Sequence, residues 1–436
     1  MKLTPFQLIL LIIAGASIII AVLIFAFSSN DNSSSNVTVT MWGTMKQQVF
    51  NNMVSKLQDQ GVNLNNVVYT EKDPSNIEKD YVKALAEGSG PDIIMLSQDQ
   101  IVQNENRVMT IPFESYPLRT YTDTFIDESD LYVVKDGILA VPFTIDPLVM
   151  YWNKTLFVKE GISSPPSFWD EVMQITPRLT VKDSAFNLEQ SAVAMGEFQN
   201  ISHAKEIFLT LIMQAGNDVV VRNKGDSANQ VKFDVILNER LGYTVPPTHA
   251  ALNFYTQFAN PAKEIYSWNR SLSFSQDRFI AGDLAMYFGF ASELNLIQQK
   301  NPNLSFDVSL IPQSRSGQNR RTFGKMNALA ISKNTPNVQA AFEVINQLSG
   351  KTAQQTLIGI TKLPPVRRDL LNSDPGDPYQ SVFYTSALWA DGILDINPVE
   401  SGAILQRLIE LFITGRLDVS DAVSRATNEL LLLLNE

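Results

Sequence analysis

The chain of 436 residues contains no cysteine and only two histidines, His203 and His249. The lack of cysteine excludes disulfides, thiolate metal sites and a cysteine nucleophile. The two histidines lie far apart and belong to no HExxH motif, so we expect surface or packing positions for both. The GxSxG motif of serine hydrolases is also missing. The sequence therefore predicts no catalytic residue, no metal and no cofactor.

Runs of lysine and arginine are missing as well. The chain has 34 Lys and Arg against 45 Asp and Glu, which gives a formal net charge of −11 at pH 7. A surface that binds nucleic acid needs a concentration of basic residues. We therefore expect no nucleic-acid partner, and we interpret the mild acidity as a feature of a soluble surface.

One long apolar run is present at the amino terminus. Residues 6–27 read FQLILLIIAGASIIIAVLIFAF. A bilayer core of roughly 30 Å needs about 20 helical residues, whereas the apolar part of a secretory signal has only about 7 to 15. Because Lys2 precedes the run and Asp31 follows it, residues 1–5 should be cytoplasmic. We expect a single-pass anchor, or an uncleaved signal, in the cell membrane, with the bulk of the protein extracytoplasmic.

After a polar tether at residues 28–36, about 400 residues remain, which is enough for two domains. Strand-like apolar runs alternate with helix-like stretches over residues 37–96, a pattern that predicts βαβ units and a parallel sheet. An extended segment with two prolines follows at 140–152, and helical patterns dominate residues 168–258. The sequence therefore predicts an α/β protein with a second, helix-rich lobe.

Aromatic and polar side chains stand at the ends of three predicted strands. Trp42 ends the first strand, Glu71 follows the second, and Gln98 and Asp99 follow the third. Open α/β sheets bind ligands beyond the carboxyl ends of their strands. An aromatic face can cover the C–H surface of a sugar, while carboxylates and amides bond its hydroxyls. We expect these four residues to contact a ligand, although core packing is an equally ordinary role for a tryptophan.

Four segments then resemble one known family, the family 1 extracellular solute-binding proteins, which include the maltose-binding type. The segments are AVPFTIDPLVMYWNK at 140–154, FIAGDLAMYFG at 279–289, ALAISK at 328–333 and LPPVR at 363–367. They follow one another in the order found in the family, and the resemblance covers nearly all of residues 37–436.

The resemblance implies a two-lobed fold of the periplasmic-binding-protein type (class II), with discontinuous lobes joined by crossing strands. Lobe I would comprise residues 37–143 and 275–322, and lobe II residues 144–274 and 323–436. It also implies a monomer that captures a small solute, typically a mono- or oligosaccharide, and presents it to the permease of an ATP-driven (ABC) importer. The permease and the ATPase would be separate subunits.

Matching positions add four candidate ligand-binding residues. Asp146 corresponds to a polar or acidic residue that enters the second lobe, and Phe290 to a position where many relatives place an aromatic on the ligand. Trp268 and Trp389 lie in segments that commonly supply further aromatics. Two departures from the family are the missing lipid-anchor cysteine, which the amino-terminal helix would replace, and Lys325 with Met326 where relatives often have glycines.

Two other functions stay open from the sequence. A membrane-anchored glycoside hydrolase would need two carboxylates, such as Asp99 and Asp146, facing each other across the ligand with pKa values pushed apart. A sensory ectodomain of the same fold would pass the closed state to a partner other than a permease. Unchanged recovery of the bound ligand would separate the first of these from a binding protein.

Overall fold

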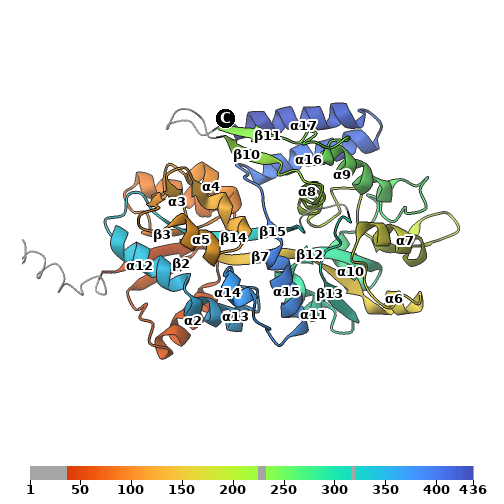
Figure 1. The fold of residues 1–436 in the computed structure, drawn as a ribbon. Coiled ribbons are helices and arrows are strands. Elements are labelled where there is room, and N and C mark those ends of the chain that lie inside the picture. The colour runs from red at the N-terminus through yellow and green to blue at the C-terminus, as the bar shows by residue number, and fades with distance from the viewer. Residues whose placement is uncertain (1–36, 224–231, 316–319, 436) are drawn as a thin grey trace, which may run out of the picture.

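The structure, a computed structural model, describes residues 37–223, 232–315 and 320–435. The predicted anchor at 6–27 and the tether at 28–36 lie outside these residues. In the described ranges, no helix has both the length and the apolar content to cross a membrane. The described chain forms two lobes that lie side by side and are joined by long strands (Figure 1).

The first lobe is built on three parallel strands. Strand β1 (Val39–Gly43) lies between β2 (Val67–Glu71) and β3 (Ile93–Ser97). Strand β3 is almost wholly buried, as expected for a strand covered on both faces. Its helices are α2 (Gln47–Asp59), α3 (Ile77–Ala86), α4 (Gln98–Asn104), α5 (Leu118–Thr124), α12 (Val338–Leu348), α13 (Lys351–Thr361) and α14 (Arg368–Leu371). A 3-10 helix, η2 (Asp127–Tyr132), and a small sheet of β4 (Ile111–Pro112), β5 (Val133–Val134) and β6 (Gly137–Ile138) complete it.

The second lobe surrounds β12 (Leu284–Phe290), which is buried along its whole length. Its other strands are β8 (Val181–Lys182), β9 (Leu188–Val193), β10 (Val220–Asn223), β11 (Lys232–Val235) and β13 (Phe306–Ser309). Its helices are α6 (Lys154–Lys159), α7 (Trp169–Leu179), α8 (Ala204–Gln214), α9 (Pro247–Thr256), η3 (Gln257–Ala259), α10 (Ser275–Ala281), η4 (Ala291–Glu293), α11 (Leu294–Lys300), α16 (Pro398–Ile413) and α17 (Val419–Leu434). The helix-rich character predicted for this lobe is confirmed.

Two long strands run from one lobe into the other. Strand β7 (Val141–Asn153) pairs antiparallel with β14 (Thr322–Ile331) at the lobe junction, and the short strand β15 (Ala390–Asp391) pairs with β14. On the first-lobe side β14 pairs with β3, and on the second-lobe side β7 pairs with β12. The two lobes therefore share one continuous sheet, of which β7 and β14 form the middle (Figure 1).

Two hydrophobic cores divide the chain differently from the predicted lobe boundaries. Met286 and Phe306, in a segment assigned to lobe I, belong to the second core. Ile345 and Leu357, in a segment assigned to lobe II, belong to the first core. The reason is that the chain re-enters the first lobe along β14, after residue 322, and not along β12. Helix α15 (Pro378–Leu388) touches both cores at the junction.

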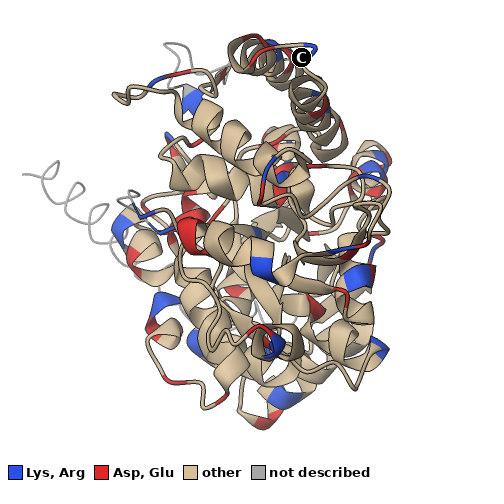
Figure 2. Ribbon diagram, turned by 90° about the vertical axis from the view of Figure 1, so that its right-hand side faces the viewer, with Lys and Arg blue, Asp and Glu red and all other residues tan. Residues whose placement is uncertain are grey.

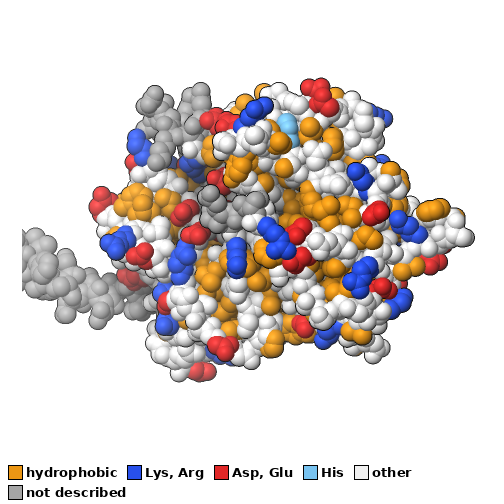
Figure 3. Space-filling model, turned by 45° about the vertical axis from the view of Figure 1, so that its right-hand side comes forward, with side chains coloured by type: hydrophobic (Ala, Val, Ile, Leu, Met, Phe, Trp, Pro, Cys, Tyr) orange, Lys and Arg blue, Asp and Glu red, His pale blue; other side chains and the backbone are white. Residues whose placement is uncertain are grey.

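Charged residues are spread over both lobes. Figure 2 shows basic and acidic residues distributed along the whole ribbon, with no region given over to one sign. Figure 3 shows a face on which charged and hydrophobic side chains are likewise mixed.

Candidate functional site

The two crossing strands present different faces at the lobe junction. Thr144 and Asp146 of β7 lie opposite Asn327 and Lys325 of β14, and all four are partly exposed. Because side chains alternate along a strand, these four share one face, which we call the cleft face. The Asn327 amide donates a hydrogen bond to the Thr144 hydroxyl at 3.2 Å. The cleft face is thus a polar floor between the lobes.

A cavity of about 270 Å³ opens at the first-lobe end of this floor. Its lining comes from the carboxyl ends of β1 and β3, the crossing strands, α13 and the loop after it. The lining residues are Thr44, Met45, Val49, Met95, Thr144, Ile145, Asp146, Asn327, Gln354, Leu357, Ile358, Thr361, Leu363, Pro364 and Pro365. Apolar walls therefore enclose a small polar floor whose charged member is Asp146.

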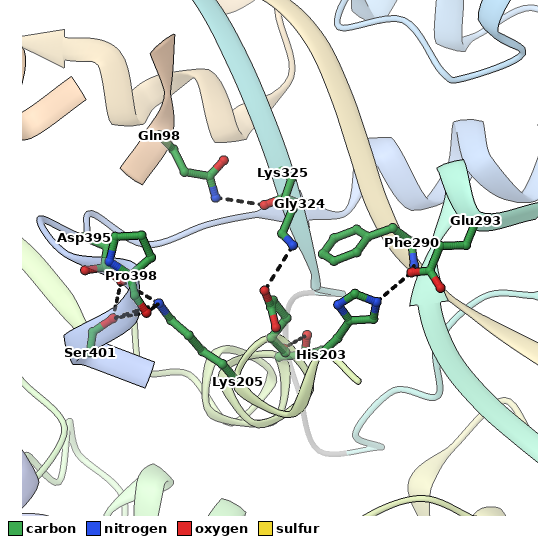
Figure 4. A network of polar contacts seen from close by, with 12 residues as sticks. Gln98, His203, Lys205, Phe290, Glu293, Gly324, Lys325, Asp395, Pro398 and Ser401 are labelled. Atoms are coloured by element: carbon green, nitrogen blue, oxygen red, sulfur yellow. Dashed lines mark hydrogen bonds and ion pairs between the residues drawn. The ribbon is translucent and has the colours of Figure 1, made fainter. Parts of the chain in front are cut away.

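The amino-terminal end of α8 forms the second-lobe side of the site (Figure 4). Lys325 reaches from β14 to Glu206 on this helix, with 3.2 Å between its Nζ and Oε1 of Glu206. The same ammonium group lies 4.0 Å from the centroid of the Phe290 ring, at cation–π distance. Burial favours the neutral form of Glu206, but the charges of Lys325 and His203 outweigh it and lower the pKa of this carboxyl.

His203 sits at the start of α8 in a left-handed conformation, with φ at 60°. Such a conformation costs a non-glycine residue roughly 1–2 kcal/mol, so neighbouring contacts must hold it. Its Nε2 lies 2.6 Å from Oε1 of Glu293, and its ring packs edge-on against Phe290 at 4.8 Å between centroids. Glu293 also accepts a hydrogen bond from the Tyr287 hydroxyl at 2.6 Å. These bonds outweigh burial and lower the pKa of Glu293.

Lys205 links α8 to the segment that precedes α16. Its Nζ lies 2.6 Å from Oδ2 of Asp395, a carboxylate only 2% exposed, and it donates to the Ser401 hydroxyl at 2.8 Å. The Ser401 hydroxyl donates in turn to Asp395 at 2.5 Å. A hydrogen bond between ion-paired groups is stronger than a neutral one, so this triad fixes the position of Lys205 (Figure 4).

Two carboxyl groups of the site lack a cationic partner. Burial raises the pKa of Asp99 to about 6, with the charge of Lys205 opposing the shift. Burial also raises the pKa of Asp146 to about 6, although hydrogen bonds from Ser292 lower it. Across the described residues, no ion pair within 4.0 Å reaches either group.

The structure brings four of the sequence-predicted site residues to the junction. Asp146 lines the cavity, Phe290 lies under Lys325, and Asp99 lies in the first turn of α4, where the charges of Lys205 and Lys325 act on it. Gln98 also lies at the junction, but its side-chain amide hydrogen-bonds the backbone of β14. It donates to the Gly324 carbonyl at 2.8 Å and accepts from the Met326 N–H at 2.6 Å, which continues the β14 ladder past the end of β3.

The other four predicted residues lie away from the cavity lining. Trp268 is fully buried in the second core and donates its indole N–H to Asn200, so it cannot meet a ligand in this structure. Trp42 is covered by the ammonium of Lys72 at 3.8 Å from the ring centroid, and Trp389 by Arg320 at 4.9 Å. Glu71 accepts hydrogen bonds from Lys46 at 2.9 Å and from the Gln47 backbone at 2.7 Å.

Sequence reasoning missed the contribution of α8. His203 was expected at a surface or packing position, yet together with Lys205 and Glu206 it forms the second-lobe side of the site. One signal could have found them, namely charged residues grouped at the start of an otherwise apolar helical stretch. As for metals, the part of the chain that the structure describes contains no group of acidic or histidine side chains that could hold one.

Comparisons with known proteins give a consistent result. A family model described as a bacterial extracellular solute-binding protein matches residues 52–381. A binding protein of Brucella abortus strain 2308 and one of Brucella suis biovar 1 are each 21% identical over 274 residues, or 61% of this chain. The chain spans about 60% of the length of these curated relatives.

Solved structures extend the likeness to almost the whole chain. A cyclo/maltodextrin-binding protein complexed with maltotetraose has a TM-score of 0.71 at 15% identity, covering 90% of this chain and 96% of its own. A protein with mannotriose bound has a TM-score of 0.65 at 18% identity, with 91% and 100% covered. An ABC substrate-binding protein of Listeria monocytogenes in complex with cycloalternan has 0.64 at 15%, with 90% and 98% covered. At these identities the likeness establishes the two-lobed α/β fold, which confirms that prediction.

Proposed function

The chain belongs to the bacterial extracellular solute-binding proteins, and from this premise we propose that it is the solute-binding subunit of an ABC importer. It captures a mono- or oligosaccharide between its lobes and presents the closed form to a permease. The observation that carries this proposal is the cavity of about 270 Å³ beside the crossing strands, with Asp146 on its floor. Crossing strands at the base of a cleft are suited to hinge closure.

The choice of carbohydrate rests on the ligands of similar structures. Proteins with bound maltotetraose, mannotriose, cycloalternan and, for one from Thermotoga lettingae, α-D-tagatose share this fold. In the cavity, the hydroxyls of Thr44 and Thr144 and the Asp146 carboxylate can bond sugar hydroxyls, while apolar walls such as Leu357 cover C–H groups. Among the residues that the structure describes, no aromatic ring lines this cavity, so aliphatic side chains take the place of the expected aromatic platform.

Residues 6–27 complete the proposal as a membrane anchor that keeps a monomeric binding domain at the outer side of the cell membrane. We prefer binding to hydrolysis because the chain belongs to a family of solute-binding proteins and because proteins of similar fold hold bound oligosaccharides.

The test is thermal unfolding of the full-length protein in a detergent without a sugar head group, against sugars, polyols, amino acids and peptides. A ligand at 100 times its dissociation constant should stabilise the folded state by about 2.7 kcal/mol. Asp146→Asn should weaken this effect, whereas Asp170→Asn, on a surface ion pair with Arg315, should not. A sugar that stabilises and is recovered unchanged supports the proposal. Turnover of the sugar would favour an enzyme, and stabilisation by peptides alone would favour a sensory role.

A further inference from the structure

The cations of the site are already paired within the protein. Lys325 binds Glu206 at 3.2 Å, Lys205 binds Asp395 at 2.6 Å and His203 binds Glu293 at 2.6 Å. Each of the three carboxylates is at most 16% exposed on its side chain. An anionic solute would therefore have to break one of these partly buried pairs, which leaves a carboxylate without its partner.

The carboxyls of the site, in contrast, outnumber its cations. The side-chain carboxyl of Asp99 has neither a hydrogen bond nor an ion pair to any residue that the structure describes. Asp146 accepts a hydrogen bond from the Ser292 N–H at 3.0 Å but has no cation. The charges with the largest effect on the pKa of Asp146 are those of Glu293, which disfavours its ionisation, and Lys325, which favours it. A ligand that brings positive charge would balance this excess.

Asp146 is positioned to bind a positively charged group of the solute. Within the described residues, Asp146 is the one ionisable side chain that lines the cavity. Thr44, Thr144 and Asn327 stand near it with hydroxyl and amide groups, while Met95 and Leu363 supply apolar wall. A carboxylate among apolar walls attracts a cation more strongly than one in water, since the local dielectric constant is lower. Burial raises the pKa of Asp146 to about 6, because it removes the water that would stabilise the ionised form.

We propose that the solute carries a protonated amino group, so that the class of ligand is an amino sugar with a free amine, whose ammonium pairs with Asp146. The inference rests on the proposed function, because it names the solute class of the same cleft. Neutral sugars of the same shape bind more weakly, and sugar acids are rejected because every cation of the site already has an anionic partner.

The experiment compares matched sugars by isothermal titration calorimetry on the full-length protein in a detergent without a sugar head group. The disaccharides are neutral cellobiose, its diamino counterpart chitobiose, the N-acetylated form N,N′-diacetylchitobiose, and cellobiouronic acid. The monosaccharides are glucose, glucosamine, N-acetylglucosamine and glucuronic acid. We expect the free amine to bind at least 10-fold more tightly than its neutral and N-acetylated counterparts, and the acid not to bind. Its affinity should rise above about pH 6 as Asp146 ionises, and fall again at the pH where the amine of the sugar loses its proton.

Variants test which residue is responsible for the preference for the amine. Asp146→Asn should reduce the ratio of amine to neutral affinity to near 1, Asp99→Asn should reduce it less, and Asp170→Asn should leave it unchanged; a melting scan of each variant establishes folding. If the wild-type protein binds a neutral sugar as tightly as its amino counterpart, the inference is overturned and the proposed function still stands. Failure of every sugar in the set to bind would overturn both.

Discussion

The crossing strands β7 and β14 have two faces that differ sharply in what covers them. The cleft face carries Thr144, Asp146, Lys325 and Asn327, all partly exposed. The opposite face, which we call the sealed face, carries Gly324 and Met326 and is covered by η2. One pair of strands thus supplies a binding floor on one side and a closed packing surface on the other, since alternate side chains point in opposite directions.

The sealed face contains an unusual group, the carboxyl of Glu128 on η2. This side chain is 0% exposed, and neither of its oxygens has a hydrogen-bond partner. It packs against Gly324 and Gly392, which belong to two segments that cross between the lobes. Burial, and next the charge of Asp99, raise its pKa to about 8. A neutral carboxyl in this place costs less than an ionised one, but it still leaves polar atoms unsatisfied.

The largest expected effect comes from filling the sealed face with Gly324→Ala. An added Cβ would lie 2.8 Å from Cδ of Glu128 and 2.9 Å from Cδ1 of Ile145. Overpacking of this kind costs about 1–3 kcal/mol. Chemical denaturation should therefore show a clear loss in the free energy of unfolding, partly recovered in the double variant with Glu128→Ala. Unchanged stability of Gly324→Ala would show that the sealed face accommodates an added methyl group without strain.

The second prediction concerns the pH dependence contributed by Glu128. Its pKa rises from 4.5 to about 8 on folding. Between these two values the folded state holds a proton that the unfolded state has lost, so the free energy of unfolding falls as pH rises. Glu128→Gln should flatten this slope in denaturation curves measured between pH 5 and 8, and an equal slope in both proteins would contradict the assignment.

The smallest effect on stability is expected on the cleft face, for Lys325→Met. The Lys325 side chain is 44% exposed, so the loss of its ion pair should change the free energy of unfolding by less than about 1 kcal/mol. The pKa of Glu206 should rise, because Lys325 is the strongest charge that lowers it. Carboxyl titration by NMR measures this shift. Lys205→Met is the control and should raise the pKa of Glu206 less, since Lys205 acts on it more weakly; the reverse order would show that the Lys325 contact is misassigned.

Local features of the site were accessible from the sequence. The two prolines at 142 and 147 marked the extended segment that became β7, and Asp146 within it lines the cavity. The alternation of strands and helices before residue 97 correctly predicted the parallel strands β1, β2 and β3 of the first lobe. These predictions depend on contacts between near neighbours in the chain, for which periodicity and turn residues are sufficient signals.

Features that depend on distant partners were not accessible in this way. Trp268 was predicted at the ligand because it lies in a segment that supplies aromatics in the family it resembles, but its indole bonds Asn200 inside the second core. Gln98 was predicted to bond ligand, but its amide bonds the backbone of β14, more than 200 residues away in the chain. In both cases the side chain could have played either role, and only the partner that folding placed beside it decided which.

The sequence by itself determined the α/β pattern, the crossing segment, the polar residues at the strand ends and the family. The tertiary structure alone decided which lobe each late segment joins, that α8 faces the crossing strands, and that the cations of the site are paired while Asp99 and Asp146 are not. The physical reason is that charge balance and burial are sums over side chains brought together from far apart in the chain, and no local pattern in the sequence records that sum.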